Sequence, residues 1–291
     1  MPISQFKDYL FPNSLGEVLS LLNSKREKAK IIGGGTTFFE LAQRGLFSDV
    51  DCIIDLKNVG LDYVKEEPSE IRIGGTATMS ELLKNESLRL PYLGAFLDAL
   101  ACVEPMQVRN VATIGGTVCA SIPFFDVPIA LCALQASAKI MNADTEKEIP
   151  IESIFLDNLV SNLDPSEFLV EVVVPKVNSV SCFLKHGRAG FDIGTVTCAI
   201  RLGVDRNSNI TSPRVFFGNV SNTPYRATEV EPVLQGRGIE DDLGKEINDA
   251  LESLEPTPTL QGSADYKKDV SKVLLRRALA ICKNRARDVS L

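Results

Sequence analysis

Residues 31–37 read IIGGGTT, with three glycines and two threonines directly behind a short apolar run. Consecutive glycines give up side-chain packing and cost extra backbone entropy on folding, so the chain there needs a positive φ or another group close to its backbone. The flanking residues predict a strand over 30–32 and a helix over 38–45 that ends at Gly45. This order is typical of an anion-binding loop, although a single glycine cluster is also common in a purely structural turn.

A second glycine turn lies about 80 residues further along the chain. Residues 109–117 read RNVATIGGT, again apolar residues, paired glycines and a hydroxyl. Such turns can bind anions through consecutive backbone N–H groups, to which threonine hydroxyls can add donors: Thr36, Thr37, Thr113 and Thr117. Neither turn has the G-x-G-x-x-G or the P-loop pattern, so an ordinary Rossmann or P-loop site is not indicated. Two such turns suit a ligand with two phosphates.

The composition is that of an ordinary globular chain. Of its 291 residues, 44% are apolar and 24% are charged, which gives no compositional reason for disorder and suggests one large or two modest domains. The net charge of −7 argues against a nucleic-acid partner or a membrane-surface role. No apolar run is long enough for a membrane span, and the N-terminus lacks signal-peptide features, so we expect a cytoplasmic protein.

Cysteine and histidine offer little metal chemistry in this sequence. The seven cysteines are scattered singly without a C-x-x-C pair, so we expect no zinc site, iron–sulfur cluster or disulfide framework. His186 is the single histidine of the sequence, and we expect a structural or exposed role for it. The sequence therefore predicts no metal ligands and no catalytic side-chain constellation.

Helix and strand patterns alternate along the first 175 residues. Strands are predicted over 52–56, 71–75, 138–141 and 167–174, and helices over 15–22, 80–85, 92–101 and 127–134. After Pro175 come predicted strands over 181–186, 195–203 and 213–218 and helices over 239–254 and 265–285. The pattern predicts an α+β chain: a domain over 1–175, with α/β subdomains at about 1–58 and 59–175, and a smaller α+β domain over 176–291.

Longer stretches around both turns resemble one family. They read IIGGGTTFFELAQRG, IIDLKNV, IRIGGTATMSELL, PMQVRNVATIGGTVCASIPFFDVPIALCAL and FLKHGRAGFDIGTVTCAI. They are similar to the FAD-binding medium subunit of molybdenum hydroxylases, the family of the xanthine dehydrogenase and carbon monoxide dehydrogenase flavoproteins. SNTPYRATEVEPVLQG and GSADYKKDVSKVLLRRAL resemble its C-terminal domain, so the similarity covers nearly the whole chain. The resemblance implies the FAD-binding fold of vanillyl-alcohol oxidase.

The resemblance also implies noncovalent FAD and the positions that contact it. Residues 33–37 and 113–117 match the two loops that hold the FAD pyrophosphate and adenosine ribose, largely through main-chain N–H groups. Asp126 matches an acidic residue that hydrogen-bonds FAD, Lys185 matches a lysine near the flavin, and Val103 lies at a position beside the isoalloxazine. The full set of implied contacts is Ile32, Gly33, Gly34, Gly35, Thr36, Thr37, Val103, Thr113, Gly116, Thr117, Cys119, Asp126, Leu169 and Lys185.

The sequence departs from the family pattern mainly at the second loop. Thr117 stands where the family generally has asparagine, and CASIPFFD over 119–126 replaces a small polar run of equal length. This side of the site is therefore expected to be more apolar than in the family. Two residues keep a second interpretation: Asp126 as an N-cap of the following helix, and Lys185 as a surface charge.

The function implied by the resemblance is electron transfer within a complex. In the family, a large subunit carries the molybdenum cofactor, a small subunit carries two [2Fe-2S] clusters, and the flavin subunit passes electrons to NAD or another acceptor. The chain would then be an oxidoreductase subunit that is incomplete without these partners. Two alternatives stay open: a stand-alone flavin-dependent oxidoreductase of the same fold, and a non-catalytic assembly subunit that has lost FAD.

Overall fold

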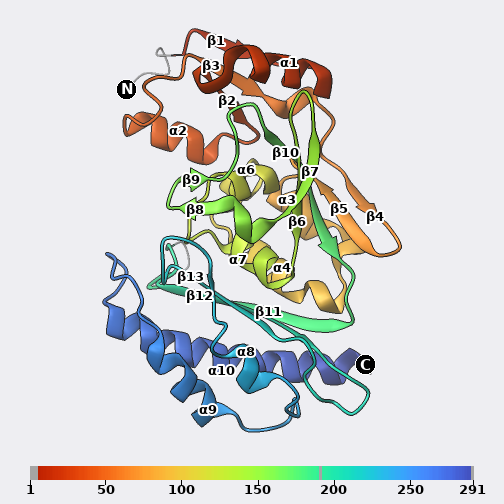
Figure 1. Ribbon diagram of the computed structural model, residues 1–291, viewed down its shortest axis with the longest axis vertical. Helices are drawn as coiled ribbons and strands as arrows, with labels where there is room; N and C mark the ends of the chain where they lie inside the picture. Colours follow the sequence, from red (N-terminus) through yellow and green to blue (C-terminus); the bar gives the residue numbers. More distant parts are fainter. Residues whose placement is uncertain (1–5, 190–191, 290–291) are drawn as a thin grey trace.

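The computed structural model describes residues 6–189 and 192–289; the outer ends of both expected domains lie outside this range. Three sheets of three to five strands follow one another along the long axis of the molecule, in chain order from the N-terminal end to the C-terminal end (Figure 1). A short two-stranded hairpin, β8 (Phe155–Asp157) and β9 (Val160–Ser161), lies beside the middle sheet. This mixed α and β architecture confirms the predicted α+β class.

The first sheet is parallel and has the order β1-β3-β2: β1 (Asp8–Leu10), β3 (Cys52–Asp55) and β2 (Ala29–Ile32). Parallel neighbours need crossover connections, and these are α1 (Leu15–Lys25) and α2 (Thr36–Gln43). Ser14 caps α1 by accepting the N–H of Glu17. The first glycine turn follows β2, so it lies at the carboxyl end of a parallel strand, where ligands of α/β sheets commonly bind.

The middle sheet is antiparallel. Its order is β4 (Val64–Glu66), β5 (Glu70–Gly74), β10 (Phe168–Pro175), β6 (Ser137–Met141) and β7 (Glu146–Pro150). The central strand β10 is buried along nearly its whole length. The helices that follow β5 are α3 (Met79–Lys84), α4 (Gly94–Cys102), α5 (Met106–Arg109), α6 (Ile114–Cys119) and α7 (Asp126–Ala133). The last of them is buried on all sides, which explains why its sequence is apolar apart from Asp126.

The third sheet is antiparallel and has helices on both faces. Its strands are β11 (Ser179–His186), β12 (Val196–Gly203), β13 (Arg214–Gly218) and β14 (Tyr225–Arg226). The long helix α10 (Ala264–Val289) packs on one face, and α4 and α7 pack on the other (Figure 1). Two shorter helices complete this part: α8 (Glu231–Leu234) and α9 (Gly244–Ala250). The helix expected over 239–254 starts late, because Asp241 and Asp242 hold the N–H groups of Gly238 and Gly244 in turns.

An ion pair between Asp98 and Arg285 joins α4 to α10. The two oxygens of Asp98 each lie 2.8 Å from a guanidinium nitrogen of Arg285. Asp98 also accepts the N–H of Phe183 at 3.1 Å, so it fixes β11 against α4. Among the described residues, no helix has the length and apolar character that a membrane crossing requires.

Candidate cofactor-binding site

The first glycine turn exposes the N-terminus of α2. Gly35 has a φ of +69°, a left-handed conformation that glycine adopts without strain. In the described part of the chain, no group accepts a hydrogen bond from the backbone N–H groups of residues 34–38, and no side chain caps the helix. The first turn of α2 also contains no acidic residue. Unpaired N–H groups and the positive end of the helix dipole together favour a bound anion.

The two glycine turns are in direct contact. A Cβ on Gly34 would lie 1.8 Å from the carbonyl oxygen of Val111, and one on Gly33 would lie 2.4 Å from Oγ1 of Thr113. Both glycines are therefore required by the packing of the second turn, whether or not a ligand is present. The contact joins two distant segments into one wall.

The second turn differs from the expectation that both loops offer free N–H groups. Thr113 is the N-cap of α6 and accepts the N–H of Gly116 on its Oγ1 at 3.2 Å. The remaining N–H groups over 114–117 donate to the carbonyls of Ala77, Gly75 and Thr113 at 2.9–3.0 Å. The second turn thus anchors α6, and the first turn carries the free donors.

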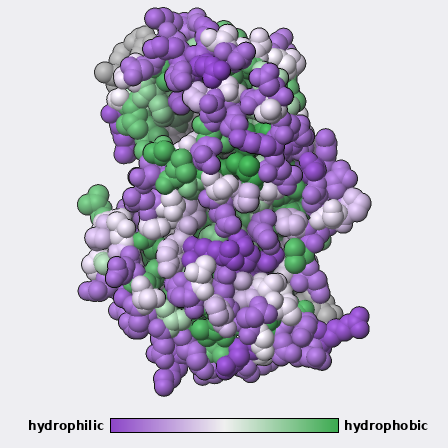
Figure 2. All heavy atoms as spheres, viewed as in Figure 1, coloured by the Kyte–Doolittle hydropathy of each residue, from purple (hydrophilic) through white to green (hydrophobic). Residues whose placement is uncertain are grey.

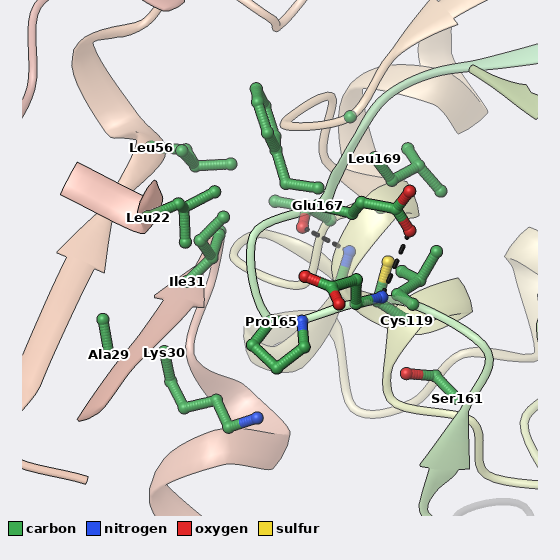
Figure 3. Close-up of a pocket in the computed structure, with 18 residues that line it drawn as sticks. Leu22, Ala29, Lys30, Ile31, Leu56, Cys119, Ser161, Pro165, Glu167 and Leu169 are labelled. Atoms are coloured by element: carbon green, nitrogen blue, oxygen red, sulfur yellow. Dashed lines mark hydrogen bonds between the residues drawn. The ribbon is translucent and has the colours of Figure 1, made fainter. Parts of the chain in front are cut away.

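Two adjoining hollows open beside this wall. The first hollow, of about 220 Å³, lies between the first sheet and residues 161–169 (Figure 3). The second hollow, of about 240 Å³, lies between the first glycine turn, α2 and the β8–β9 hairpin. Both are lined by Lys30, Ile31, Gly33, Thr113, Gly116, Cys119 and Ser161. Because they share these residues, one extended ligand can occupy both.

The two hollows have largely apolar walls. In the first hollow, Leu22 and Leu56 come from the N-terminal part and face Leu169 of β10 (Figure 3). Figure 2 shows apolar surface gathered over α2, where the second hollow is lined by Phe38, Leu41, Leu46 and Phe47. Apolar walls with a few polar groups at one junction are typical of sites for ring-containing cofactors.

Most of the residues predicted from the sequence line these hollows. They are Ile32, Gly33, Gly34, Gly35, Thr36, Thr37, Thr113, Gly116, Thr117, Cys119 and Leu169. Val103, Asp126 and Lys185 line neither hollow. His186 also lies outside both, and its Nε2 is 2.9 Å from the hydroxyl of Tyr266.

Asp126 and Lys185 form an ion pair between α7 and β11. Lys185 Nζ lies 2.9 Å from Asp126 Oδ2, and the two side chains are only 17% and 6% exposed. The other oxygen, Asp126 Oδ1, is buried without a hydrogen-bond partner among the described residues. Burial raises the pKa of Asp126 to about 6, although the charge of Lys185 opposes this shift. The interpretation of Asp126 as an N-cap is wrong, because Phe125 occupies that position and no side chain caps α7.

Val103 is the C-cap residue of α4. Arg109 holds the chain there by donating from Nη1 to the carbonyl of Val103 at 3.0 Å and to that of Ala101 at 3.2 Å. Burial raises the pKa of the neighbouring thiol, Cys102, to about 11. The negative charge of Asp126 adds to this increase, and the positive charge of Lys185 opposes it. The helix α4 packs against α7 and β11, the two elements that carry the Asp126–Lys185 pair.

Several lining residues were missed by sequence reasoning. Lys30 lines both hollows, lies 5.9 Å from the centre of the Phe47 ring, and makes no ion pair with a described residue. Its position next to the glycine turn is the one signal that points to it. Leu22, Leu56 and Ser161 come from distant segments and carry no local signal of a site.

Comparisons with known proteins agree with this geometry. Residues 4–177 match the family described as the FAD binding domain in molybdopterin dehydrogenase, and residues 181–281 match the CO dehydrogenase flavoprotein C-terminal domain. The chain is 28% identical to the 6-hydroxypseudooxynicotine dehydrogenase complex subunit alpha of Paenarthrobacter nicotinovorans, over 96% of this chain and 95% of that protein. It is 28% identical to the glyceraldehyde dehydrogenase medium chain of Sulfolobus acidocaldarius, over 93% and 96%.

A solved structure shares the whole fold. It is a carbon monoxide dehydrogenase from Hydrogenophaga pseudoflava that lacks the Mo-pyranopterin moiety, with a TM-score of 0.88 and 27% identity over 96% of this chain and 98% of that chain. The first family match covers more than half of the sequence, and it includes both glycine turns and their hollows. The chain therefore belongs to the FAD-binding subunits of the molybdenum hydroxylase family.

Proposed function

We propose that this chain is the electron-transferring flavoprotein subunit of a molybdenum-containing hydroxylase or dehydrogenase complex. In this proposal FAD binds without a covalent bond, accepts electrons from the [2Fe-2S] clusters of a small partner subunit, and passes them to NAD or another acceptor. A large partner subunit holds the molybdenum cofactor. The names of relatives support an assembly, since they describe a subunit of a dehydrogenase complex and medium chains.

The observation that carries the proposal is the row of N–H groups over residues 34–38 that find no acceptor among the described residues. A pyrophosphate placed there would receive backbone hydrogen bonds and the favourable helix dipole, with the hydroxyls of Thr36 and Thr37 beside it. Gly116 leaves room for such a ligand, since a Cβ there would meet only Oγ1 of Thr113, at 3.0 Å. These residues suit the diphosphate of FAD.

The residues on either side of the first glycine turn suggest where the two ends of FAD lie. We place the adenosine end in the first hollow, whose walls include Leu22, Leu56 and Leu169. We place the isoalloxazine toward Val103 and the Asp126–Lys185 pair. The buried and unpartnered Oδ1 of Asp126 supports this direction, because it can accept a hydrogen bond from a hydroxyl or N–H of the cofactor.

When bound, FAD supplies the electron-accepting ring, and the chain supplies binding and electrostatics. The apolar walls keep water from the cofactor's ring systems, and the Asp126–Lys185 pair places one negative and one positive charge beside the proposed flavin position. No side chain is assigned a bond-making role. His186 Nε2 lies 2.9 Å from the hydroxyl of Tyr266, and this contact within the chain supports a noncovalent cofactor.

Electron transfer with and without the partner subunits tests the proposed function. We expect the purified chain to show the two visible absorption bands of oxidised flavin, and we expect substrate to bleach them only when the molybdenum and iron–sulfur subunits are present. Equally fast reduction of the isolated chain by a small-molecule substrate would indicate a stand-alone flavoenzyme. A chain that binds no flavin would indicate an assembly subunit.

A further inference from the structure

Residues 161–169, here called the retaining segment, bridge two parts of the molecule across the first hollow. The segment runs from β9 to β10 and lines the hollow opposite Leu22 and Ile31 of the N-terminal part (Figure 3). Its side chains at the hollow include Leu163, Pro165 and Leu169. The segment therefore forms one wall of the hollow in which we place the adenosine end.

The middle of the retaining segment is a turn held by its own hydrogen bonds. Asp164 Oδ1 accepts the N–H of Ser166 at 2.9 Å. Glu167 Oε2 accepts the N–H of Asp164 at 3.1 Å, and the N–H of Glu167 donates to the carbonyl of Asp164 at 2.8 Å. With Pro165 between them, these residues form a preorganised unit rather than a flexible loop.

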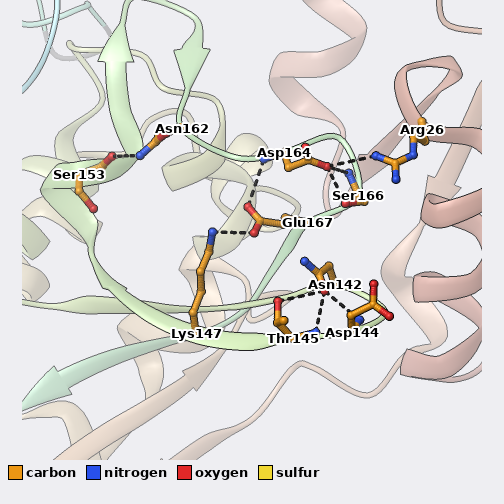
Figure 4. Close-up of polar contacts among 10 residues, drawn as sticks. All are labelled: Arg26, Asn142, Asp144, Thr145, Lys147, Ser153, Asn162, Asp164, Ser166 and Glu167. Carbon is orange, nitrogen blue, oxygen red and sulfur yellow. Dashed lines mark hydrogen bonds and ion pairs between the residues drawn. The ribbon is translucent and has the colours of Figure 1, made fainter.

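Charged contacts anchor this turn on both sides (Figure 4). Toward the middle sheet, Lys147 of β7 lies 2.6 Å from Glu167; the Lys147 side chain is 44% exposed and that of Glu167 is 8% exposed. Toward the first sheet, Arg26 lies 3.7 Å from Asp164, and both side chains are about half exposed. The side-chain amide of Asn162 also donates a hydrogen bond to the carbonyl of Ser153 at 3.3 Å. The Lys147–Glu167 pair is the stronger anchor, because its carboxylate is shielded from water, whereas both partners of the Arg26–Asp164 pair are about half exposed.

We propose that the retaining segment sets the rate at which the bound cofactor leaves, with Glu167 as its positioning residue. Lys147 holds Glu167, Glu167 holds the turn, and the turn keeps Pro165 and Leu169 against the first hollow. The Arg26–Asp164 pair closes the same wall onto the first sheet. This inference rests on the proposed function, because it takes the ligand to be FAD.

The release of FAD from the full-length holoprotein tests the inference. After rapid dilution, the recovery of flavin fluorescence gives the dissociation rate. Lys147→Met should raise this rate about tenfold, which corresponds to about 1.4 kcal/mol, and Lys147→Arg should restore it. Arg26→Gln should raise it only about twofold and should reduce the part of the rate that increases with salt.

Lys176→Met is the matched control. It removes an ion pair of the same length, 2.6 Å to Glu66, from the far side of the middle sheet, where neither residue lines a hollow. It should lower the unfolding temperature as Lys147→Met does and leave FAD release unchanged. Release of FAD from Lys147→Met at the wild-type rate, or equal acceleration in Lys176→Met, would overturn the inference. A wild-type chain that binds no FAD would overturn the proposed function itself.

Discussion

The carbonyl oxygen of Val111 lies where Gly34 would carry a side chain, 1.8 Å from the position of a Cβ. The first glycine turn therefore has a structural duty in addition to its free N–H groups. Gly34→Ala should force the two turns apart and lower the free energy of unfolding by about 2–3 kcal/mol. Chemical denaturation of the apoprotein measures this loss. A variant as stable as wild type would show that the turns do not pack as described.

The buried guanidinium group of Arg201 should lower the free energy of unfolding. Arg201 is 4% exposed, it lies directly opposite Arg214 in the ladder of β12 and β13, and its Nε has no partner among the described residues. Its other two nitrogens make only long hydrogen bonds, to Gln135 Oε1 at 3.4 Å and to the carbonyl of Ser212 at 3.5 Å, and it makes no ion pair with a described residue. Burial and the charge of Arg214 lower the pKa of Arg201 to about 10. Arg201→Met should therefore raise the free energy of unfolding by about 1 kcal/mol, because replacing a poorly paired buried charge by an apolar side chain is neutral or stabilising.

Arg214→Met is the contrasting variant. Arg214 donates to the carbonyl of Cys132 at 3.2 Å and to Glu152 at 3.1 Å, so its removal leaves both acceptors without this donor. We expect a loss of about 1–3 kcal/mol. Equal effects of the two substitutions in thermal or chemical unfolding would contradict this account of the arginine pair.

The stability of the apoprotein should depend on pH through Asp126. The pKa of Asp126 is raised from 3.8 to about 6 in the folded state, so the folded state binds more protons than the unfolded state between these values. The contribution of Asp126 to the free energy of unfolding should therefore fall as the pH rises from about 4 to about 6, by at most about 3 kcal/mol. Unfolding curves across this range, for wild type and for Asp126→Asn, measure the difference. A pH dependence that is the same in both proteins would contradict the assignment.

Local patterns predicted β2 and β3 of the first sheet but missed its third strand, β1. The uninterrupted apolar run of β3 and the capped helix α1 were predicted because each is encoded by neighbouring residues. The strand β7 was missed because its sequence, EKEIP, is exposed at a sheet edge and has no apolar alternation. The helix α6 was missed because Gly115 and Gly116 have low helix propensity; contacts with residues 75–77 stabilise it instead.

The candidate site could likewise be predicted only in part. Both glycine turns are visible in the sequence, and the resemblance to a family paired them. The far wall of the first hollow was not predictable, because Leu22, Leu56 and the retaining segment meet only through the tertiary fold. The free N–H groups of the first turn and the engaged ones of the second could likewise be told apart only from their partners in space. The predicted boundaries of the domains and the individual FAD contacts stay predictions.

The flavin content of Gly116→Val tests the central claim, that FAD lies against the two glycine turns, most directly. Gly116 lines both hollows, and a Cβ there meets only Oγ1 of Thr113 at 3.0 Å, so the valine should occupy ligand space and change the stability of the apoprotein by less than about 1 kcal/mol. We predict equimolar flavin in purified wild type and almost none in a folded Gly116→Val. A folded variant that retains flavin at the wild-type level would contradict the account.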